Sequence, residues 1–480
     1  MKLSTNNKIN IKKLEHINGK SPDLVIRTLN KKISYAFFES VSSDNKISDF
    51  LNKALININF YFDNVYNRIK NNLYNSKVKE VTNFKDLYYY LESGFTIIFI
   101  NGFSKALAVE TRETLDRGIT DVKSEMGIKG PRDSFTENFN KNLGLIRKRI
   151  KDENLKVCEY LIGRRSKTKV GLLYIKDIAF IDNVNKIKEK LSKINIDAIL
   201  DTGYIRDFLI EKKSIFPTII NSERPDLVCA SLLEGKIAII VENTPYVLVI
   251  PGLLNNFIHS SEDSYQKAIH VTFTRFLRLI ALLITILVPA FYVAITTFNQ
   301  EVIPDTLLIS LAIQRSGVPF PTSFAVFILM ITFELLRESD IRLPEKMGTS
   351  ISIVGALVLG DAAVNAGIVS PIVVIVVAIS SITSLLFTDT DLINALRFWK
   401  FFVLLFSASM GLIGFVIASL ILVTNLCSIE VIGIPYLTPF SPINLDALKD
   451  SLFMVSRNKM KKRADYLAKN IIRIGDKNEK

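Results

Sequence analysis

The residues with the clearest potential for chemistry lie in an apolar stretch around position 360. Asp361 and Asn365 are spaced i, i+4, so a helix would place a carboxylate and a carboxamide on one face. A carboxylate at membrane depth is costly unless it faces protein, water or an ion. A buried partner and a polar pathway are therefore both open explanations of Asp361.

Small residues recur at helical spacing beside this pair. They are Ser352, Ala356, Gly360, Ala363 and Gly367. A helix with a wholly small face can pack closely against another membrane helix, which is the simpler explanation of the pattern. The alternative is that the face lines a pore. Together with Asp361 and Asn365, these residues form our candidate pore or helix-packing face.

A second candidate site is the polar pair Glu334 and Arg337, near the end of another apolar stretch. Side chains three positions apart on a helix are neighbours, so the spacing predicts a local ion pair. Because the apolar stretch ends here, we place the pair near a membrane surface.

The chain lacks the short motifs that mark common catalytic and cofactor sites. The segment IGRRSKT (162–168) does not have the glycine spacing of a phosphate-binding loop. The three histidines and three cysteines are scattered without the spacing of a zinc site, and no GxSxG nucleophile elbow occurs. We therefore expect no enzyme activity, no catalytic residue, no cofactor and no metal site.

Charge is distributed unevenly along the 480 residues, although the whole chain has a net charge of +13. Residues 276–424 contain 7 Lys and Arg against 9 Asp and Glu, whereas residues 1–275 contain 43 against 32. A water-soluble domain with as few charges as residues 276–424 would have an apolar surface. The sequence therefore predicts that these residues form a membrane-embedded block. The positive charges of the N-terminal region are dispersed and lack an interleaved aromatic platform, so we expect no nucleic-acid partner.

Apolar windows in this block predict a polytopic helical transmembrane domain over 270–440, with four to six segments. The windows are 279–300, 316–333, 351–369, 362–388 and 401–424. The asymmetry of Lys and Arg places the start of the first window on the cytoplasmic side. A fifth crossing at 401–424 would leave the C-terminus outside, yet the basic residues near 460 favour the cytoplasmic leaflet. The number of crossings and the side of the C-terminus stay open.

The region before the membrane block alternates short apolar runs with helical periodicity, which predicts an α/β fold. Segments 91–111 and 233–250 both combine a helix end, a glycine, a strand, a turn and a second strand. We interpret them as parts of two related small α/β subdomains, at 31–129 and 157–265. Chance recurrence of the strand–helix–hairpin order is the alternative. The remaining segments are predicted to be a flexible tail at 1–30, a linker helix at 130–156 and a basic cytoplasmic tail at 441–480.

The linker helix has signals at both ends. Ser134 and Glu137 have the spacing of an N-terminal capping box. Its C-terminal turns contain the basic run Arg147, Lys148, Arg149 and Lys151. We interpret these cations as partners of the helix dipole rather than as an anion site.

Several longer motifs match those of a known family. They are GPRDSFTEN (130–138), SERPD (222–226), LEGKIAIIVENTPYVLVIP (233–251), QRSGVPFP (314–321), FELLRESDIRLP (333–344), SIVGALVLGDAAVNAGIVSP (352–371) and GIPYLTPFSP (433–442). With these motifs in this order, the chain resembles the A subunits of spore germinant receptors, the GerA family of spore germination proteins. Residues 30–90 are more divergent.

The resemblance implies an integral protein of the spore inner membrane, with a cytoplasmic N-terminal domain, that is needed for germination in response to nutrients. It implies a transporter-like B subunit and a lipoprotein C subunit as partners, homo-oligomerisation, and a germinant-gated channel for monovalent cations. The alternative is a non-conducting scaffold or signal-coupling subunit of the germination or dipicolinate-release machinery. A secondary transporter is less favoured, because the internal repeat lies in the soluble region and not among the membrane segments.

Overall fold

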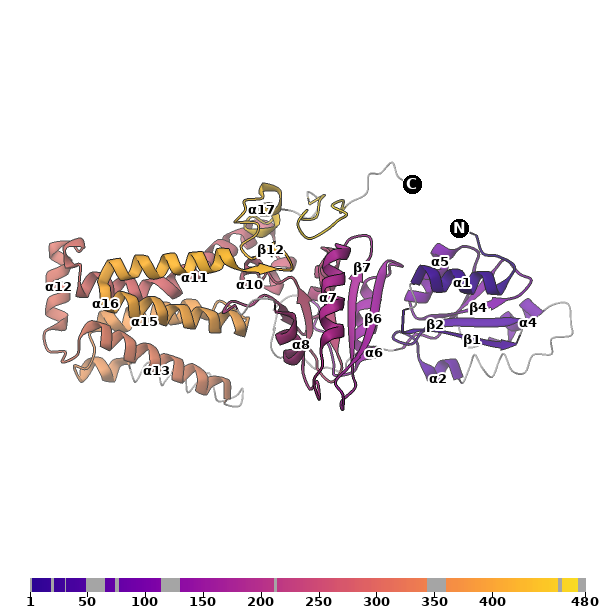
Figure 1. Ribbon diagram of the computed structural model, residues 1–480, viewed down its shortest axis with the longest axis horizontal. Helices are drawn as coiled ribbons and strands as arrows, with labels where there is room; N and C mark the ends of the chain where they lie inside the picture. The colour runs from indigo at the N-terminus through magenta and orange to yellow at the C-terminus, as the bar shows by residue number, and fades with distance from the viewer. Residues whose placement is uncertain are drawn as a thin grey trace. The chain divides into compact units, whose positions relative to one another are not determined.

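The computed structural model describes residues 2–18, 21–30, 32–48, 65–73, 77–113, 130–210, 214–342, 360–455 and 460–473. The chain divides into two compact units. The sheet unit comprises Met1–Glu211, Ile219–Gly252 and Arg457–Lys480, and the helical unit comprises Lys212–Thr218 and Leu253–Ser456. The two large β-sheets belong to the sheet unit, and the long helices belong to the helical unit (Figure 1).

The first sheet has the strand order β1-β2-β4-β5-β3, and all its neighbouring strands are antiparallel. The strands are β1 (Leu24–Asn30), β2 (Ile33–Phe38), β3 (Val78–Val81), β4 (Phe95–Ile100) and β5 (Ala106–Glu110). Helices α1 (Asn7–Asn18) and α5 (Phe84–Glu92) cover one face, and α4 (Val65–Asn72) covers the other. Because both faces are covered, β2 and β4 are buried at every position and have no polar alternation.

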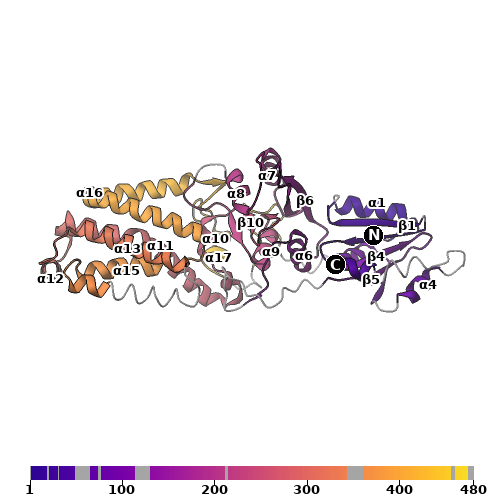
Figure 2. The ribbon, with the colours of Figure 1, turned by 90° about the horizontal axis from the view of Figure 1, so that it is seen from below.

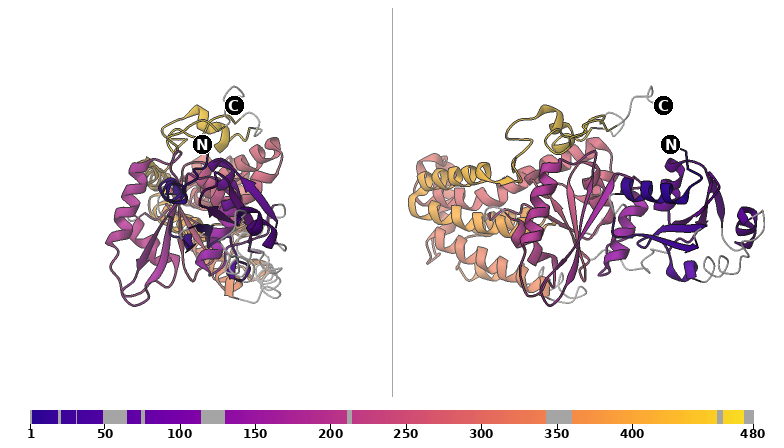
Figure 3. Two further views of the ribbon diagram at one scale, coloured as in Figure 1. Left: turned by 90° about the vertical axis from the view of Figure 1, so that its right-hand side faces the viewer. Right: turned by 45° about the vertical axis from the view of Figure 1, so that its right-hand side comes forward.

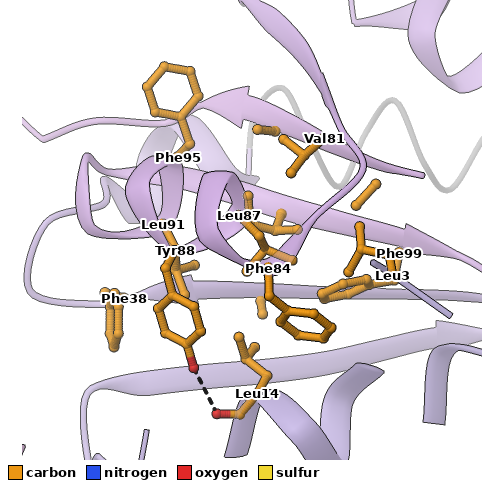
Figure 4. Close-up of a cluster of buried hydrophobic side chains, with 14 of the residues drawn as sticks. Leu3, Leu14, Phe38, Val81, Phe84, Leu87, Tyr88, Leu91, Phe95 and Phe99 are labelled. Carbon is orange, nitrogen blue, oxygen red and sulfur yellow. Dashed lines mark hydrogen bonds between the residues drawn. The ribbon is translucent and has the colours of Figure 1, made fainter. Parts of the chain in front are cut away.

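The core beneath α1 and α5 is shown in Figure 4. Leu14 of α1 and Leu87 and Leu91 of α5 are fully buried against the sheet. Tyr88 is buried beside them, and its hydroxyl donates a hydrogen bond to the carbonyl oxygen of Leu14 at 3.2 Å. The two helices are therefore joined by a polar contact as well as by the apolar core.

The N-terminal 30 residues were predicted to be a flexible tail, but the structure contains α1 and β1 there. The buried positions of α1 include Asn7 and Asn10, whose side chains hydrogen-bond the backbone instead of packing as apolar groups. Asn7 Nδ2 donates to the carbonyl oxygens of Lys32 and Phe99, both at 3.1 Å. Hydrophobic periodicity is weak in such a helix, so the prediction was wrong.

The second sheet has the same strand order, β6-β7-β9-β10-β8. Its strands are β6 (Leu155–Ile162), β7 (Thr168–Ile175), β8 (Ile220–Ser222), β9 (Ile237–Val241) and β10 (Val247–Ile250). The hairpin β9–β10 occupies the place of β4–β5, and α9 (Pro225–Leu233) precedes it as α5 precedes β4. These are the segments whose likeness suggested two related subdomains. Helix α7 (Ile181–Lys193) lies beside this sheet (Figure 3), and α8 (Thr202–Leu209) follows it in the chain.

Helix α6 (Phe139–Arg149) precedes the second sheet in the chain. Asn138 is its N-cap, and the side chain accepts a hydrogen bond from the backbone amide of Lys141 at 3.0 Å. The predicted capping box of Ser134 and Glu137 was therefore wrong. Asn caps a helix as well as Ser does, so the sequence offers two competing start positions, and Ser134 is instead fully buried before the helix begins.

The C-terminal residues return to the sheet unit. Ala468 forms a backbone bridge with Ala179, and the amide of Lys469 donates to the carbonyl oxygen of Ile178 at 2.7 Å. A Cβ on Gly235 would lie 2.4 Å from the carbonyl oxygen of Leu467, so the close approach requires a glycine.

Two arginines add side-chain contacts to this return. Arg463 Nε donates to the carbonyl oxygen of Leu233 at 2.6 Å, and Arg473 pairs with Glu234. The predicted tail at 441–480 is thus divided in the structure: α17 (Leu445–Ser451) belongs to the helical unit, whereas residues 460–473 belong to the sheet unit.

The helical unit contains α10 (Leu254–Ile258), α11 (Ala268–Thr297), α12 (Asp305–Arg315), α13 (Thr322–Arg342), α15 (Pro371–Ser384) and α16 (Thr390–Ser428), seen from two sides in Figures 1 and 2. Residues 360–365 are also helical. Helix α11 is long and apolar enough to cross a membrane, and the residues of α16 are equally apolar, with mean hydropathies of 2.5 and 2.4 in the most apolar windows.

Helix α16 reverses its direction at Gly411, where φ is 62° and ψ is −139°. A Cβ on Gly414 would lie 2.1 Å from the carbonyl oxygen of Phe406, although one straight helix would separate these residues by about 12 Å. Residues 390–410 and 412–428 therefore form two antiparallel helices. The predicted single crossing over 401–424 was wrong, because a uniformly apolar run does not show where a glycine lets the chain turn.

The helix contacts define two ends of the helical unit. At the turn end, the amide of Leu412 donates to Asn299 Oδ1 at 3.1 Å, and Arg315 donates to the carbonyl oxygen of Thr296 at 3.3 Å. At the opposite end, the Phe216 ring contacts both Trp399 and Tyr436, with centroids 6.3 and 6.2 Å apart. We call it the charged end, because Glu334, Arg397 and Lys400 also lie there. The start and the finish of the α16 hairpin therefore lie at the same end.

Replacing Gly411 with alanine should destabilise the hairpin, because a side chain at this φ is strained and its Cβ would lie 2.6 Å from Phe298 Cβ. We expect the free energy of unfolding to fall by at least about 1–2 kcal/mol, which should lower the melting temperature of the purified chain in detergent. Gly360→Ala is the matched control, since among the described residues its Cβ would meet Val374 Cγ1 at 3.5 Å, an ordinary contact distance. Equal melting temperatures for the two variants would contradict the reversal at Gly411.

Candidate functional site

The most deeply buried charge of the sheet unit is Arg147 on α6, whose side chain has no exposed surface. Its Nε and Nη2 donate to the two carboxylate oxygens of Asp23, at 2.8 and 2.9 Å. Its Nη1 donates to Glu92 at 3.1 Å, and its guanidinium lies over the Phe38 ring, 4.0 Å from the centroid. Asp23 precedes β1 and Glu92 ends α5, so one side chain of α6 joins two elements of the first subdomain.

The two carboxylates differ in how many donors they receive. Burial raises the pKa of Asp23, but the charge of Arg147 and hydrogen bonds from Arg147, Ser21 and Ser40 outweigh burial and hold that pKa below its usual value. Burial likewise raises the pKa of Glu92, to about 7, and its single hydrogen bond to Arg147 only partly opposes the shift. Asp23 is therefore the main counter-charge of Arg147.

A second cluster lies at the charged end of the helical unit. Glu334 of α13 contacts Lys400 Nζ at 2.8 Å and Arg397 Nε at 2.7 Å, both on α16. Arg337 does not pair with Glu334 and instead donates to the hydroxyl of Ser384 on α15, at 3.1 Å. The predicted local pair of Glu334 and Arg337 is thus replaced by contacts between helices.

The candidate face around position 360 is only partly described. Ser352 and Ala356 lie outside the described residues, whereas Gly360 is buried and Ala363 is half-buried. Gly367 has φ of 65° and ends the helix, because the amides of Gly367 and Ile368 bond back to the carbonyl oxygens of Val364 and Ala363, both at 2.9 Å.

The two polar residues of this face are both exposed in the single chain. The Asn365 side chain donates to Asp361 Oδ2 at 3.1 Å, so the hydrogen bond of Asp361 stays on its own helix. No buried partner for Asp361 is found among the described residues. The surface containing Asp361 is therefore available to water or to another chain.

Sequence reasoning missed three roles that depend on contacts distant in the chain. Arg147 was grouped with its basic neighbours, although it follows Leu143 by four positions and so shares the apolar face of the helix. That position was the available signal. The other two roles are those of Arg397 and Lys400, and no local pattern in the sequence connects them to Glu334.

Comparison with known proteins identifies the family. Residues 12–466 match the family model described as "Bacillus/Clostridium GerA spore germination protein". This chain belongs to the GerA family. The match includes both the sheet unit and the helical unit.

Three relatives of this GerA-family protein are 35–39% identical to it over the aligned residues. It is 39% identical to spore germination protein KA of Bacillus subtilis over 82% of this chain and 72% of that protein. It is 36% identical to spore germination protein GerLA of Bacillus cereus, over 82% of this chain and 80% of that protein. It is also 35% identical to the uncharacterized membrane protein YfkQ of Bacillus subtilis, over 93% and 88%.

A solved structure covers part of the chain. It is the crystal structure of the N-terminal domain of the A subunit of the Bacillus megaterium spore germinant receptor GerK3. The match has 31% sequence identity and a TM-score of 0.42, and it covers 53% of this chain and 98% of that one.

Replacing Arg147 with methionine should destabilise the sheet unit by about 3–5 kcal/mol, because two buried carboxylates would lose their counter-charge. The free energy of opening can be measured from hydrogen exchange of the β4 amides in the full-length protein. Arg149→Met is the matched control on the same helix. Arg149 pairs with the half-buried Asp133, so its loss should cost less than about 1 kcal/mol. A similar loss of opening free energy in both variants would show that the buried pairs of Arg147 stabilise the sheet unit no more than a half-exposed pair does.

Proposed function

We propose that this GerA-family protein is a subunit of a nutrient germinant receptor in the spore inner membrane. In this proposal it oligomerises into a germinant-gated channel for monovalent cations, and cation release starts germination. It acts there with a transporter-like B subunit, which binds the nutrient, and a lipoprotein C subunit. The relatives named as spore germination proteins support the biological role, and the helical unit supports a place in the membrane.

Membrane embedding is supported by the outer surface of the helical unit. Large apolar side chains on α15 and α16 are more than half exposed, including Ile375, Ile382, Leu405, Ile413 and Leu420. Their exposure in water would be unfavourable, whereas acyl chains would cover them at no such cost. We therefore treat the unit as a polytopic bundle in lipid.

An even number of crossings follows from the way the chain enters and leaves this unit. The passes that the structure describes are α11, α13, α15, 390–410 and 412–428, and the sixth is proposed for the connection from α13 to α15, most of which lies outside the described residues. Residues 460–473 then contact the sheet unit, to which the N-terminal strands also belong. The proposal is six crossings with both termini in the cytoplasm, which removes the conflict between a fifth crossing and a basic C-terminus.

Asp361 supports a conducting role. Its carboxylate is exposed in the single chain, and its partner Asn365 lies on the same helix, so lipid would be an unfavourable neighbour for both. Several copies arranged around an axis would instead present the carboxylates to a water-filled path, where a ring of acids selects cations. In this arrangement the candidate face of Gly360, Ala363 and Gly367 either packs against a neighbouring helix or lines the path.

The topology predicts which positions react with a membrane-impermeant maleimide in sealed vesicles. In a cysteine-free background, Ser192→Cys and Lys469→Cys should be labelled from one side, and Glu301→Cys at the turn end from the other. All three side chains are exposed, and detergent should make each reactive, which controls for access. Labelling of Lys469→Cys from the same side as Glu301→Cys would contradict an even number of crossings.

Cation flux tests the conducting role. The full-length protein is reconstituted with its partner subunits in liposomes, and rubidium efflux is measured after germinant is added. Asp361→Asn should lower the efflux severalfold, because the path would lose its ring of charge. Asp305→Asn, at an exposed acid that begins α12, should leave it unchanged. Equal efflux from the wild type and Asp361→Asn would remove Asp361 from the path, and no efflux from any complex would favour the non-conducting scaffold.

A further inference from the structure

The charged end of the helical unit has more positive than negative charge. Arg397 and Lys400 contact the carboxylate of Glu334, and Arg337 lies three positions further along the same helix and donates to Ser384. These four residues together have a net charge of +2 where three helices meet, and the next carboxylate of α13, the exposed Glu338, lies one helical turn further along.

The three cations differ in their burial and in how many of their N–H donors already have a partner. Lys400 is almost completely buried, with 3% of its side chain exposed, and Glu334 holds it. Arg337 is half-buried, and one of its five N–H groups donates to Ser384. Arg397 is also half-buried and faces Glu334 through Nε. Glu334 contacts both Lys400 and Arg397, and each arginine has five N–H groups, so both half-buried guanidinium groups keep donors for an additional anion.

Exposed apolar side chains are next to the residues of this cluster in the sequence. Leu335 follows Glu334 directly and is 66% exposed, and Phe398 follows Arg397 directly and is 49% exposed. Leu385, next to Ser384, is 64% exposed. A free inorganic anion would gain nothing from these groups. A molecule with a phosphate head and acyl chains would satisfy the arginines and cover the apolar side chains together.

We propose that Arg337 and Arg397 bind the phosphate of an anionic phospholipid at the cytoplasmic surface of the membrane. Arginine suits this role because its planar guanidinium donates two parallel hydrogen bonds to phosphate oxygens. Bound lipid would connect α13 to α16 beside the Glu334–Lys400 contact. The inference rests on the proposed membrane position of the helical unit and extends it to lipid composition.

The single tryptophan of the chain gives a direct readout. Trp399 lies between Phe398 and Lys400 in the sequence, and its ring is 5.7 Å from that of Phe398 and 5.3 Å from that of Phe402. Full-length protein is reconstituted in phosphatidylcholine vesicles that contain a small fraction of brominated lipid, which quenches nearby tryptophan fluorescence. Brominated phosphatidylglycerol should quench Trp399 more strongly than brominated phosphatidylcholine at the same mole fraction.

Variants identify the residues responsible for the preference. Arg337→Gln should lower the relative affinity for phosphatidylglycerol about fivefold, whereas Arg337→Lys should keep part of it. Arg315→Gln is the matched control, because Arg315 lies at the turn end of the same bundle. Equal quenching by both brominated lipids, or an equal loss in Arg315→Gln, would overturn the proposal.

A competition experiment separates a lipid from a free anion. Millimolar inorganic phosphate should leave the preference for phosphatidylglycerol intact, and its abolition would show that a free phosphate occupies the site instead. Quenching by brominated phosphatidylcholine reports whether the helical unit is in the bilayer at all. Its absence would contradict the proposed membrane position, whereas its presence without a lipid preference would contradict only the lipid site.

Discussion

The sheet unit depends on the buried ion pairs that Arg147 forms with Asp23 and Glu92. A guanidinium without solvent contact is stable only when its charge and its donors are matched, and here Asp23 and Glu92 supply the match. Because the three residues come from α6, the segment before β1 and the end of α5, their contact requires all three elements to be in place. The ion pairs thus specify an arrangement more than they add stability, since burying charge offsets much of what the pairs contribute.

The helical unit depends on a different constraint, which is the way its chain reverses. In the proposed membrane position, backbone groups must be satisfied within the helices themselves, so turns need to be short and placed at the ends of helices. Gly411 makes such a turn inside an apolar run, and Asn299 caps it by accepting the amide of Leu412. This hairpin brings the chain back to the end at which it entered, and residues 460–473 can then rejoin the sheet unit.

The two clusters of charge have opposite characters. In the sheet unit Arg147 faces two carboxylates and is enclosed by protein, so nothing remains for a ligand. At the charged end Glu334 contacts Arg397 and Lys400, Arg337 lies one turn away on the same helix, and both arginines are half-buried. Asp361 differs from both, because it is an exposed acid whose hydrogen-bond partner lies on its own helix. In the proposals made above, the first kind of site serves assembly, the second binds lipid and the third lies on the ion path.

The sequence by itself determined the family, the α/β character of the N-terminal region, the recurrence of its hairpins and the apolar character of residues 276–424. These properties follow from local patterns, such as the apolar runs at β4 and β9 and the motifs from 130 to 442. Only the tertiary structure decided that α1 and β1 belong to the first sheet, that Arg147 is buried, that the apolar run reverses at Gly411 and that Glu334 pairs with α16. Each of these depends on which distant groups meet, and neither the periodicity of a segment nor its composition records the position of a partner far along the chain.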